Sequence, residues 1–346
     1  MHKRRTKIRL ISSIFLVGAV LVCYKVSKSL LVMRDAWPTR NFEKAKNQAF
    51  SDVVYEMYDH EDKNVLLKSS EIQQEDDGSL NFSNLVSDFK ISNTENGKIS
   101  ADKTYTKNES AKQCKFVGNV KLTTDSGLKM QTEVSLVDFN KQTAEGESPV
   151  TVTQNDIKLE ANKYHFDLLN RVFVLTDQAQ GNVKQDSIVA DKIIIELQKT
   201  AAKLPKRIEA IGNAVYKSAN YTLSAKKSIN YTPENVDAYQ NAKLMYRGNK
   251  KTYDISADHI SGKLKNEKID SAKMIGHVAI KSKDAIIRGN YGSFRGNILT
   301  VSENVSIVNA RGKILCEKAE INTITNEMKI LNSRGMISKG NTSDGK

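Results

Sequence analysis

The chain has 346 residues, which is enough for one large domain or two medium ones. An apolar fraction of 39% with only four prolines predicts a globular protein and excludes a disordered or low-complexity stalk. The formal net charge is +13, but no basic block carries interleaved aromatic residues, so we do not expect nucleic acid to be a partner.

The N-terminal segment combines a basic start with one apolar run. Residues 1–7 are predicted to be a cytoplasmic basic tail, and residues 8–26 a transmembrane anchor long enough to cross the hydrocarbon core. A cleaved signal peptide is the alternative. However, no small-residue cleavage site follows, and Lys25 and Lys28 lie where cleavage would be expected. We therefore expect an uncleaved single-pass protein whose remaining chain lies across the membrane.

Residues 27–62 are expected to be a linker, and the part from 41 to 58 fits either a short helix or an irregular segment. Beyond it, short apolar runs alternate with polar residues at a period of two, which is typical of half-buried strands. Cys114 and Cys316, the cysteines beyond the anchor, are some 200 residues apart. They are expected to be separate core residues and not a disulfide.

One short phrase recurs along the chain at intervals of about 30 residues. It reads Gly-Asn-Val or a variant of it, at 118–120, 148–150, 181–183, 212–214, 240–242, 276–278, 303–305 and near 333. Each unit continues as a short strand, a turn and a longer alternating strand. The glycine and asparagine of the phrase are interpreted as a turn or strand entry.

A unit of two strands cannot bury its apolar face alone, so successive units must stack. The sequence therefore predicts an elongated all-β fold of two facing sheets, either a jelly roll or a solenoid. Such a stack ends in two unpaired strand edges, which are suited to pairing with a strand of another chain.

The repeats resemble two related families. Residues 118–183, from GNVKLTTDSGLKMQ to LTDQAQGNV, resemble LptC, the membrane-anchored bridge component of lipopolysaccharide export. The stretch EAIGNAVYKSANYTLSAKKSINYTPEN (209–235) is similar to the OstA-like repeats of its soluble periplasmic partner. We therefore expect an LptC-like β-jelly-roll domain at 63–200, an OstA-like repeat extension at 201–336 and a disordered tail at 337–346. The extension departs from the family, whose members usually end after about one such domain.

The resemblance implies a twisted β-jelly roll with a V-shaped cross-section, whose apolar interior shields lipid acyl chains. It also implies a protein of the bacterial inner membrane, periplasmic in bulk. The implied partners are lipopolysaccharide or a related lipid, an inner-membrane ABC-type export complex and a soluble OstA-like bridge protein. Eight apolar residues are expected to line the cleft: Leu122, Leu128, Met130, Val134, Leu136, Ile157, Leu159 and Phe166. Tight, dry core packing is the alternative interpretation of each.

The C-terminal edge strand, roughly 320–330, is expected to dock the bridge protein through Glu320, Ile321, Asn322, Thr323 and Ile324. No catalytic residue, cofactor or metal site is predicted, since the histidines lack metal-ligand spacing and no nucleophile or phosphate-loop motif is present. The alternative function is an anchored structural or adhesin-like β-solenoid of the cell envelope without lipid cargo.

Overall fold

A computed structural model describes residues 49–58, 64–75, 78–106, 113–198, 204–247, 252–266, 268–310 and 312–338. This part of the chain contains strands and no helix, so the prediction of an all-β fold is confirmed. None of it could therefore cross a membrane as an apolar helix, and the anchor predicted at 8–26 lies outside the described residues. The tail predicted at 337–346 also lies outside them, except for its first two residues.

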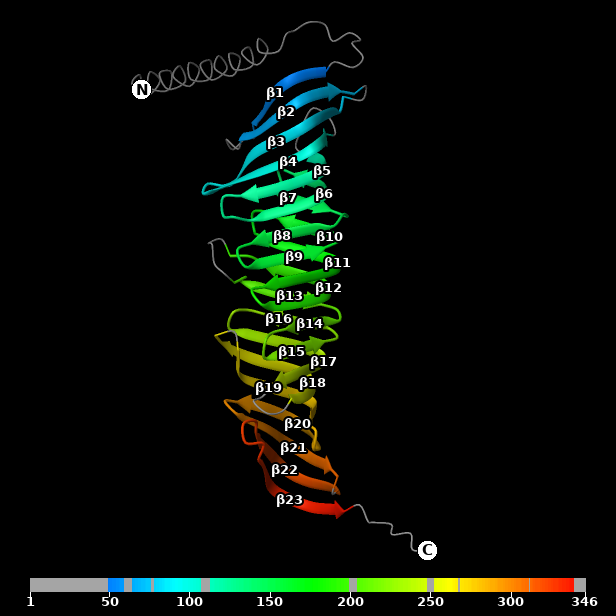
Figure 1. Cartoon of the computed structure of the whole chain (residues 1–346), viewed down its shortest axis with the longest axis vertical. Helices are drawn as coiled ribbons and strands as arrows, with labels where there is room; N and C mark the ends of the chain where they lie inside the picture. The colour runs from blue at the N-terminus through cyan, green and yellow to red at the C-terminus, as the bar shows by residue number, and fades with distance from the viewer. Residues whose placement is uncertain are drawn as a thin grey trace, which may run out of the picture. The chain divides into compact units, whose positions relative to one another are not determined.

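The strands form one antiparallel ladder in which nearly every strand pairs with its chain neighbours (Figure 1). The first six are β1 (Ala49–Tyr58), β2 (Asn64–Gln74), β3 (Leu80–Ser92), β4 (Glu95–Thr106), β5 (Gln113–Thr124) and β6 (Lys129–Asp138). The central ones are β7 (Thr143–Gly146), β8 (Val150–Gln154), β9 (Ile157–Ala161), β10 (Lys163–Asp167), β11 (Val172–Val183), β12 (Asp186–Glu196), β13 (Arg207–Ile211), β14 (Ala214–Lys217), β15 (Tyr221–Ala225) and β16 (Ser228–Tyr231). The last seven are β17 (Asn235–Arg247), β18 (Thr252–Lys265), β19 (Lys268–Lys281), β20 (Ala285–Arg295), β21 (Ile298–Asn309), β22 (Gly312–Asn322) and β23 (Met328–Ser338).

Residues 49–58, where the sequence allowed a helix, form strand β1 along the edge of β2. The apolar residues Phe50, Val53 and Val54 fit a helical spacing, but they also fit a strand that is bent at Asp52, whose φ is 51°. The backbone groups of β2 provide the partners that decide between the two structures.

Each rung of the ladder bends in its middle, so that its two halves lie in two facing arms. The bend breaks four rungs into separate half-strands, namely β7/β8, β9/β10, β13/β14 and β15/β16. The twenty-three strands within the described residues therefore make nineteen rungs. We call arm 1 the sheet that contains β7, β10, β13 and β16, and arm 2 the sheet that contains β8, β9, β14 and β15, each with the halves of the long strands that pair with them.

The recurring phrase identified in the sequence forms many of these bends. Gly118 and Asn119 both have positive φ, 80° and 48°, and the ladder shifts register there. A Cβ on Gly118 would lie 2.6 Å from Oδ2 of Asp102, the bend residue of the preceding rung. Asn119 Nδ2 donates to that same oxygen at 2.8 Å. The glycine is therefore required both by its backbone conformation and by the close approach of the carboxylate.

The same arrangement recurs farther along the ladder. Asn213 Nδ2 donates to Asp191 Oδ2 at 3.0 Å, and His277 Nδ1 lies 2.8 Å from Asp258 Oδ2. The phrase thus marks a bend inside a rung and not the turn or strand entry expected from the sequence. One assignment was also wrong: Gly181 and Asn182 continue the straight part of β11, and the bend of that rung lies at Asp177 and Gln178, with φ of 60° and 58°.

The hydrophobic core lies between the two arms, and aromatic rings pack across it. Phe89 of arm 2 meets Phe139 of arm 1 with ring centroids 5.4 Å apart, and Tyr216 of arm 2 stacks on Tyr231 of arm 1 at 5.4 Å. Near the C-terminal end, Tyr246 and Phe294 make a similar contact at 5.1 Å. In the described residues the interior is therefore a packed core at these levels of the ladder.

The described residues, from 49 to 338, belong to one compact unit. The boundary expected near residue 200 falls between β12 and β13, which pair with each other from Lys192 to Glu196. The ladder thus continues from the LptC-like part into the repeat extension without an unpaired edge. Its two end strands are β1 and β23, each with a single partner strand in the described structure.

Candidate functional site

Six of the eight apolar residues expected to line a cleft lie in the interior between the arms. Each of them is at most 3% exposed: Leu122, Leu128, Met130, Ile157, Leu159 and Phe166. They belong to β5, β6, β9 and β10 and to the turn before β6, so the structure brings them together along neighbouring rungs. Their burial fits both a packed core and a wall for acyl chains.

The other two residues do not follow this pattern. Leu136 is 40% exposed on the outer surface of arm 1, and Val134 is only half-buried. The reason is the bend of β6, where Glu133 lies opposite the Gly118–Asn119 pair of β5. Before the bend the buried residues are Met130 and Thr132, and after it they are Ser135 and Val137. A shift of one residue at a bulge moves every later side chain to the opposite face, which an unbroken alternation cannot show.

Several hydroxyl groups are buried in this apolar interior. The Oγ atom of Ser87 and the Oγ1 atom of Thr104 are enclosed and have no hydrogen-bond partner among the described residues. Both residues are fully buried, on β3 and β4 respectively. A buried hydroxyl without a partner costs about 1–3 kcal/mol, so a molecule that supplied a partner would be stabilised there.

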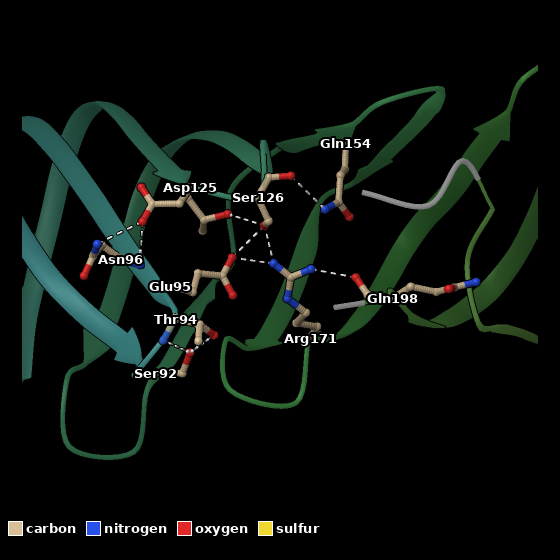
Figure 2. A network of polar contacts seen from close by, with 10 residues as sticks. Ser92, Thr94, Glu95, Asn96, Asp125, Ser126, Gln154, Arg171 and Gln198 are labelled. Carbon is tan, nitrogen blue, oxygen red and sulfur yellow. Dashed lines mark hydrogen bonds and ion pairs between the residues drawn. The ribbon is translucent and has the colours of Figure 1, made fainter. Parts of the chain in front are cut away.

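The free tips of the two arms are joined by polar contacts on the side away from the bends. The strongest involves Arg171, at the β10–β11 tip of arm 1 (Figure 2). Its Nη2 donates to Glu95 Oε1 and to Ser126 Oγ, both on tips of arm 2, and its Nη1 donates to the carbonyl of Gln198 at 2.6 Å. Ser126 Oγ donates in turn to Glu95 Oε1 at 2.6 Å. The guanidinium is therefore surrounded by acceptors from both arms.

Two weaker contacts join the tips elsewhere. Gln142, at the preceding tip of arm 1, donates from Nε2 to the carbonyl of Lys90 in arm 2 at 3.4 Å. In the second half of the chain, Tyr253 of arm 2 donates from its hydroxyl to Asn326 Oδ1 at 2.8 Å, on the β22–β23 tip of arm 1. No motif in the sequence predicts a role for any of these residues.

A shared sequence pattern marks the two tips that carry Gln142 and Arg171. Asp138 and Asp167 each accept the backbone N–H of the residue three positions later, at 2.9 Å. In both tips a long polar residue, Gln142 or Arg171, follows at the next position, with φ of 54° and 57°. An alignment of the repeats at their tips, and not at their bends, would have placed Gln142 and Arg171 in equivalent positions.

The electrostatics of the Arg171 contact favour the ionised pair. Burial acts to raise the pKa of the Glu95 carboxyl, but the hydrogen bonds from Ser126 and Arg171 and the positive charge of Arg171 outweigh it, so the pKa is lowered. The side chains are 5% exposed for Arg171 and 14% exposed for Glu95. A buried charge pair of this kind is destabilised strongly when one partner is removed.

The residues expected to form the C-terminal docking edge do not lie on the terminal strand of the ladder. Strand β22 contains Glu320, Ile321 and Asn322. It pairs with β21 on one side and, over most of its length, with β23 on the other side. Thr323 and Ile324 lie in the β22–β23 turn. The expected edge was placed one strand too early, because β23 follows after a short turn and occupies the end of the ladder.

The remaining candidate groups are the possible metal ligands and the two cysteines beyond residue 26. In the described residues no group of three His, Cys, Asp or Glu side chains could hold a metal ion. Cys114 on β5 and Cys316 on β22 are both buried in the core. Burial raises the pKa of the Cys114 thiol to about 12, which keeps it protonated near neutral pH.

Comparison with known proteins supports one family. Residues 19–184 match the model of a family described as lipopolysaccharide-assembly, LptC-related. The matched segment covers just under half of the chain and ends at the hairpin between β11 and β12. A search among curated proteins found no match. The match confirms the resemblance to LptC-related proteins, and it supports a role in lipopolysaccharide assembly or transport, a description that names no catalytic activity.

Proposed function

We propose that this protein holds the acyl chains of lipopolysaccharide, or of a related lipid, between its two arms and passes them along the ladder to a further β-jelly-roll subunit. The proposal rests on the match of residues 19–184 to a lipopolysaccharide-assembly family together with a continuous apolar interior. Burial of each acyl CH₂ group contributes roughly 0.8 kcal/mol, so a long apolar path can retain a lipid without specific polar contacts.

The single observation that carries this proposal beyond the family match is the pair of buried hydroxyls without partners in this apolar interior. Ser87 and Thr104 line the interior in the part of the chain that matches the family. Carbonyl and hydroxyl groups near the head of a lipid would give these hydroxyls their missing hydrogen bonds. Because rings from the two arms meet across the interior, lipid entry requires the arms to move apart.

The chain would work as an inner-membrane-anchored component with residues 8–26 as the anchor and the ladder in the periplasm. An ABC-type export complex would supply the lipid and the energy, so the chain itself needs no cofactor. The repeat extension, β13 to β23, would lengthen the path within the same polypeptide. The terminal strand β23 would then pair edge to edge with a soluble OstA-like bridge protein.

A photo-crosslinking experiment in cells tests the proposal. A crosslinking residue at Leu122 or Leu159, both about 1% exposed or less, should capture lipopolysaccharide, whereas one at Leu136 on the outer face should not. A crosslinking residue at Lys329 on β23 should capture the bridge protein. Lipid capture at Leu136 equal to that at Leu122, or no capture at either interior position, would contradict lipid holding.

A second candidate function is an anchored structural β-solenoid of the envelope with a permanently packed interior. The aromatic contacts across the arms, such as Tyr216 with Tyr231, are the observation that favours it. The same experiment separates the two functions, since a scaffold would yield partner crosslinks at β23 and none to lipid at Leu122.

A further inference from the structure

The arms can separate only on the side where their tips meet. On the opposite side each rung continues from one arm to the other through its bend, or is interrupted there by a few residues at most. Access to the interior from the side therefore lies between the tips. The polar contacts that join those tips are Gln142 with Lys90, Arg171 with Glu95 and Ser126, and Tyr253 with Asn326.

Arg171 differs from every other basic residue in the described part of the chain, because it alone is buried, at 4% exposure. It also has a φ of 57°, in the left-handed region that arginine rarely adopts. A residue in this conformation persists where its surroundings hold it. Here the holding contacts come from both arms, as Figure 2 shows.

The surroundings of Arg171 allow the contact to open without prior unpacking of the core. A hollow of about 550 Å³, lined by residues that include Ser92, Asp125 and Leu169, lies against the Arg171–Glu95 pair. Leu169, two residues before Arg171 in the same tip, is 48% exposed. Water can therefore reach the pair from outside through this hollow.

We propose that Arg171, with Glu95 and Ser126, forms a latch that holds the two arms closed over the N-terminal half of the interior, and that its release admits lipid there. The admission of lipid rests on the proposed function, whereas the latch itself does not. Gln142 adds one neutral hydrogen bond between the arm tips of the same half. Tyr253 and Asn326 join the arm tips of the C-terminal half separately.

The native cysteines provide a test of the latch without lipid. Cys114 lies in the half of the ladder that the latch closes, and Cys316 lies near the far end, so alkylation of each under native conditions reports opening at two places. Mass spectrometry of the alkylated peptides measures the two rates in one sample. In Arg171→Ala we expect Cys114 to react several-fold faster and Cys316 to react at its wild-type rate. The matched control is Arg207→Ala, which removes a half-exposed arginine and should change neither rate.

Equal Cys114 rates in wild type and Arg171→Ala, with native circular dichroism in both, would overturn the latch. If Arg171→Ala does not fold, a closed variant replaces it. Arg171→Cys with Ser126→Cys, joined by a reducible bifunctional thiol reagent, should protect Cys114 from alkylation until the bridge is reduced. An unchanged Cys114 rate before and after reduction would overturn the latch in the same way.

Purified lipopolysaccharide micelles extend the test to lipid, with the crosslinking residue at Leu122. Capture should be faster in Arg171→Ala than in wild type and blocked in the bridged variant until reduction. Equal capture in bridged and reduced protein would overturn the latch as the route of entry. Failure of every variant to capture lipid, with the Cys114 rates changed as expected, would support the latch and overturn the proposed lipid holding.

Discussion

Gly118 shows how a single position can be fixed by two independent constraints. Its φ of 80° disfavours any other residue, and its missing Cβ leaves room for the Asp102 carboxylate. Gly127 has a nearly equal φ of 82° but faces open space. Substitution of Gly127 therefore measures the free-energy cost of backbone strain alone, and substitution of Gly118 measures that strain together with the contact to Asp102.

We expect Gly118→Ala to lower the free energy of unfolding by about 2–4 kcal/mol, because the methyl group adds a clash to the backbone strain. Gly127→Ala, where only the strain applies, should cost about 1 kcal/mol. Urea denaturation followed by circular dichroism measures both values. Equal losses in the two variants would show that the Asp102 contact does not constrain the bend.

Glu95 predicts a pH dependence with a defined sign. Its pKa is lowered in the folded protein, so the stability that its ionised form contributes is present above the ordinary value of 4.5 and is lost as the pH falls through the folded value. Asp138, whose pKa is also lowered, contributes in the same direction.

The contribution of Glu95 is isolated by the difference in unfolding free energy between wild type and Glu95→Gln, because the contribution of Asp138 is the same in both proteins and cancels. We expect this difference to be constant from about pH 6 to 8 and to shrink below about pH 4.5. A constant difference down to pH 3 would contradict the assignment.

At the scale of single elements, the bends decide which face each side chain takes. The alternation of polar and apolar residues correctly predicted strands over nearly the whole ladder. It also placed Leu128 and Met130 in the interior, because these precede the bend of β6. It misplaced Leu136, because no local signal in residues 128–140 marks the extra residue that β5 contributes opposite Glu133. That information lies in the pairing of two strands and not in either strand alone.

The shift in alternation can be tested with two adjacent substitutions on β6. Leu136→Lys should change the free energy of unfolding by less than about 0.5 kcal/mol, because the side chain already lies on the surface. Val137→Lys should cost more than about 4 kcal/mol or prevent folding, since Val137 is fully buried and the charge would have no partner. Thermal unfolding of the two proteins measures the contrast, and the reverse order would refute the structural position of the bend.

Arg171 illustrates what the sequence cannot show at this scale. Its partners are 76 and 45 residues away, on tips of the other arm, and their approach depends on how the arms fold together. The terminal edge was misjudged for a related reason, because a short turn after Thr323 was not recognised as the start of one more hairpin.

At the scale of the whole ladder, stability should vary with position. The backbone hydrogen bonds of each rung go to its neighbouring rungs, so the unit resembles a linear array in which the end rungs have one partner each. We expect amide hydrogen exchange of β1 and β23 to be at least about tenfold faster than that of β11 and β12. Mass spectrometry of peptic fragments resolves these strands. Uniform exchange along the ladder would instead indicate a single cooperative unit.

The length of the ladder follows from its rung count. Nineteen rungs at a spacing of about 4.8 Å extend roughly 85 Å, and the rungs after residue 184, where the family match ends, supply more than half of that distance. Under the proposed function, the extension would carry lipid over a span for which a shorter LptC-like chain would need additional subunits.

The position of the bends on one side and the tips on the other has a consequence for the cargo. A channel closed all round would have to be as wide as the largest part of whatever passes through it. A path closed by separable tips has no such limit, because a bulky sugar chain can stay in solvent while only the acyl chains travel inside. Under the proposed function, transport should therefore be insensitive to the length of the polysaccharide and sensitive to the number and length of the acyl chains.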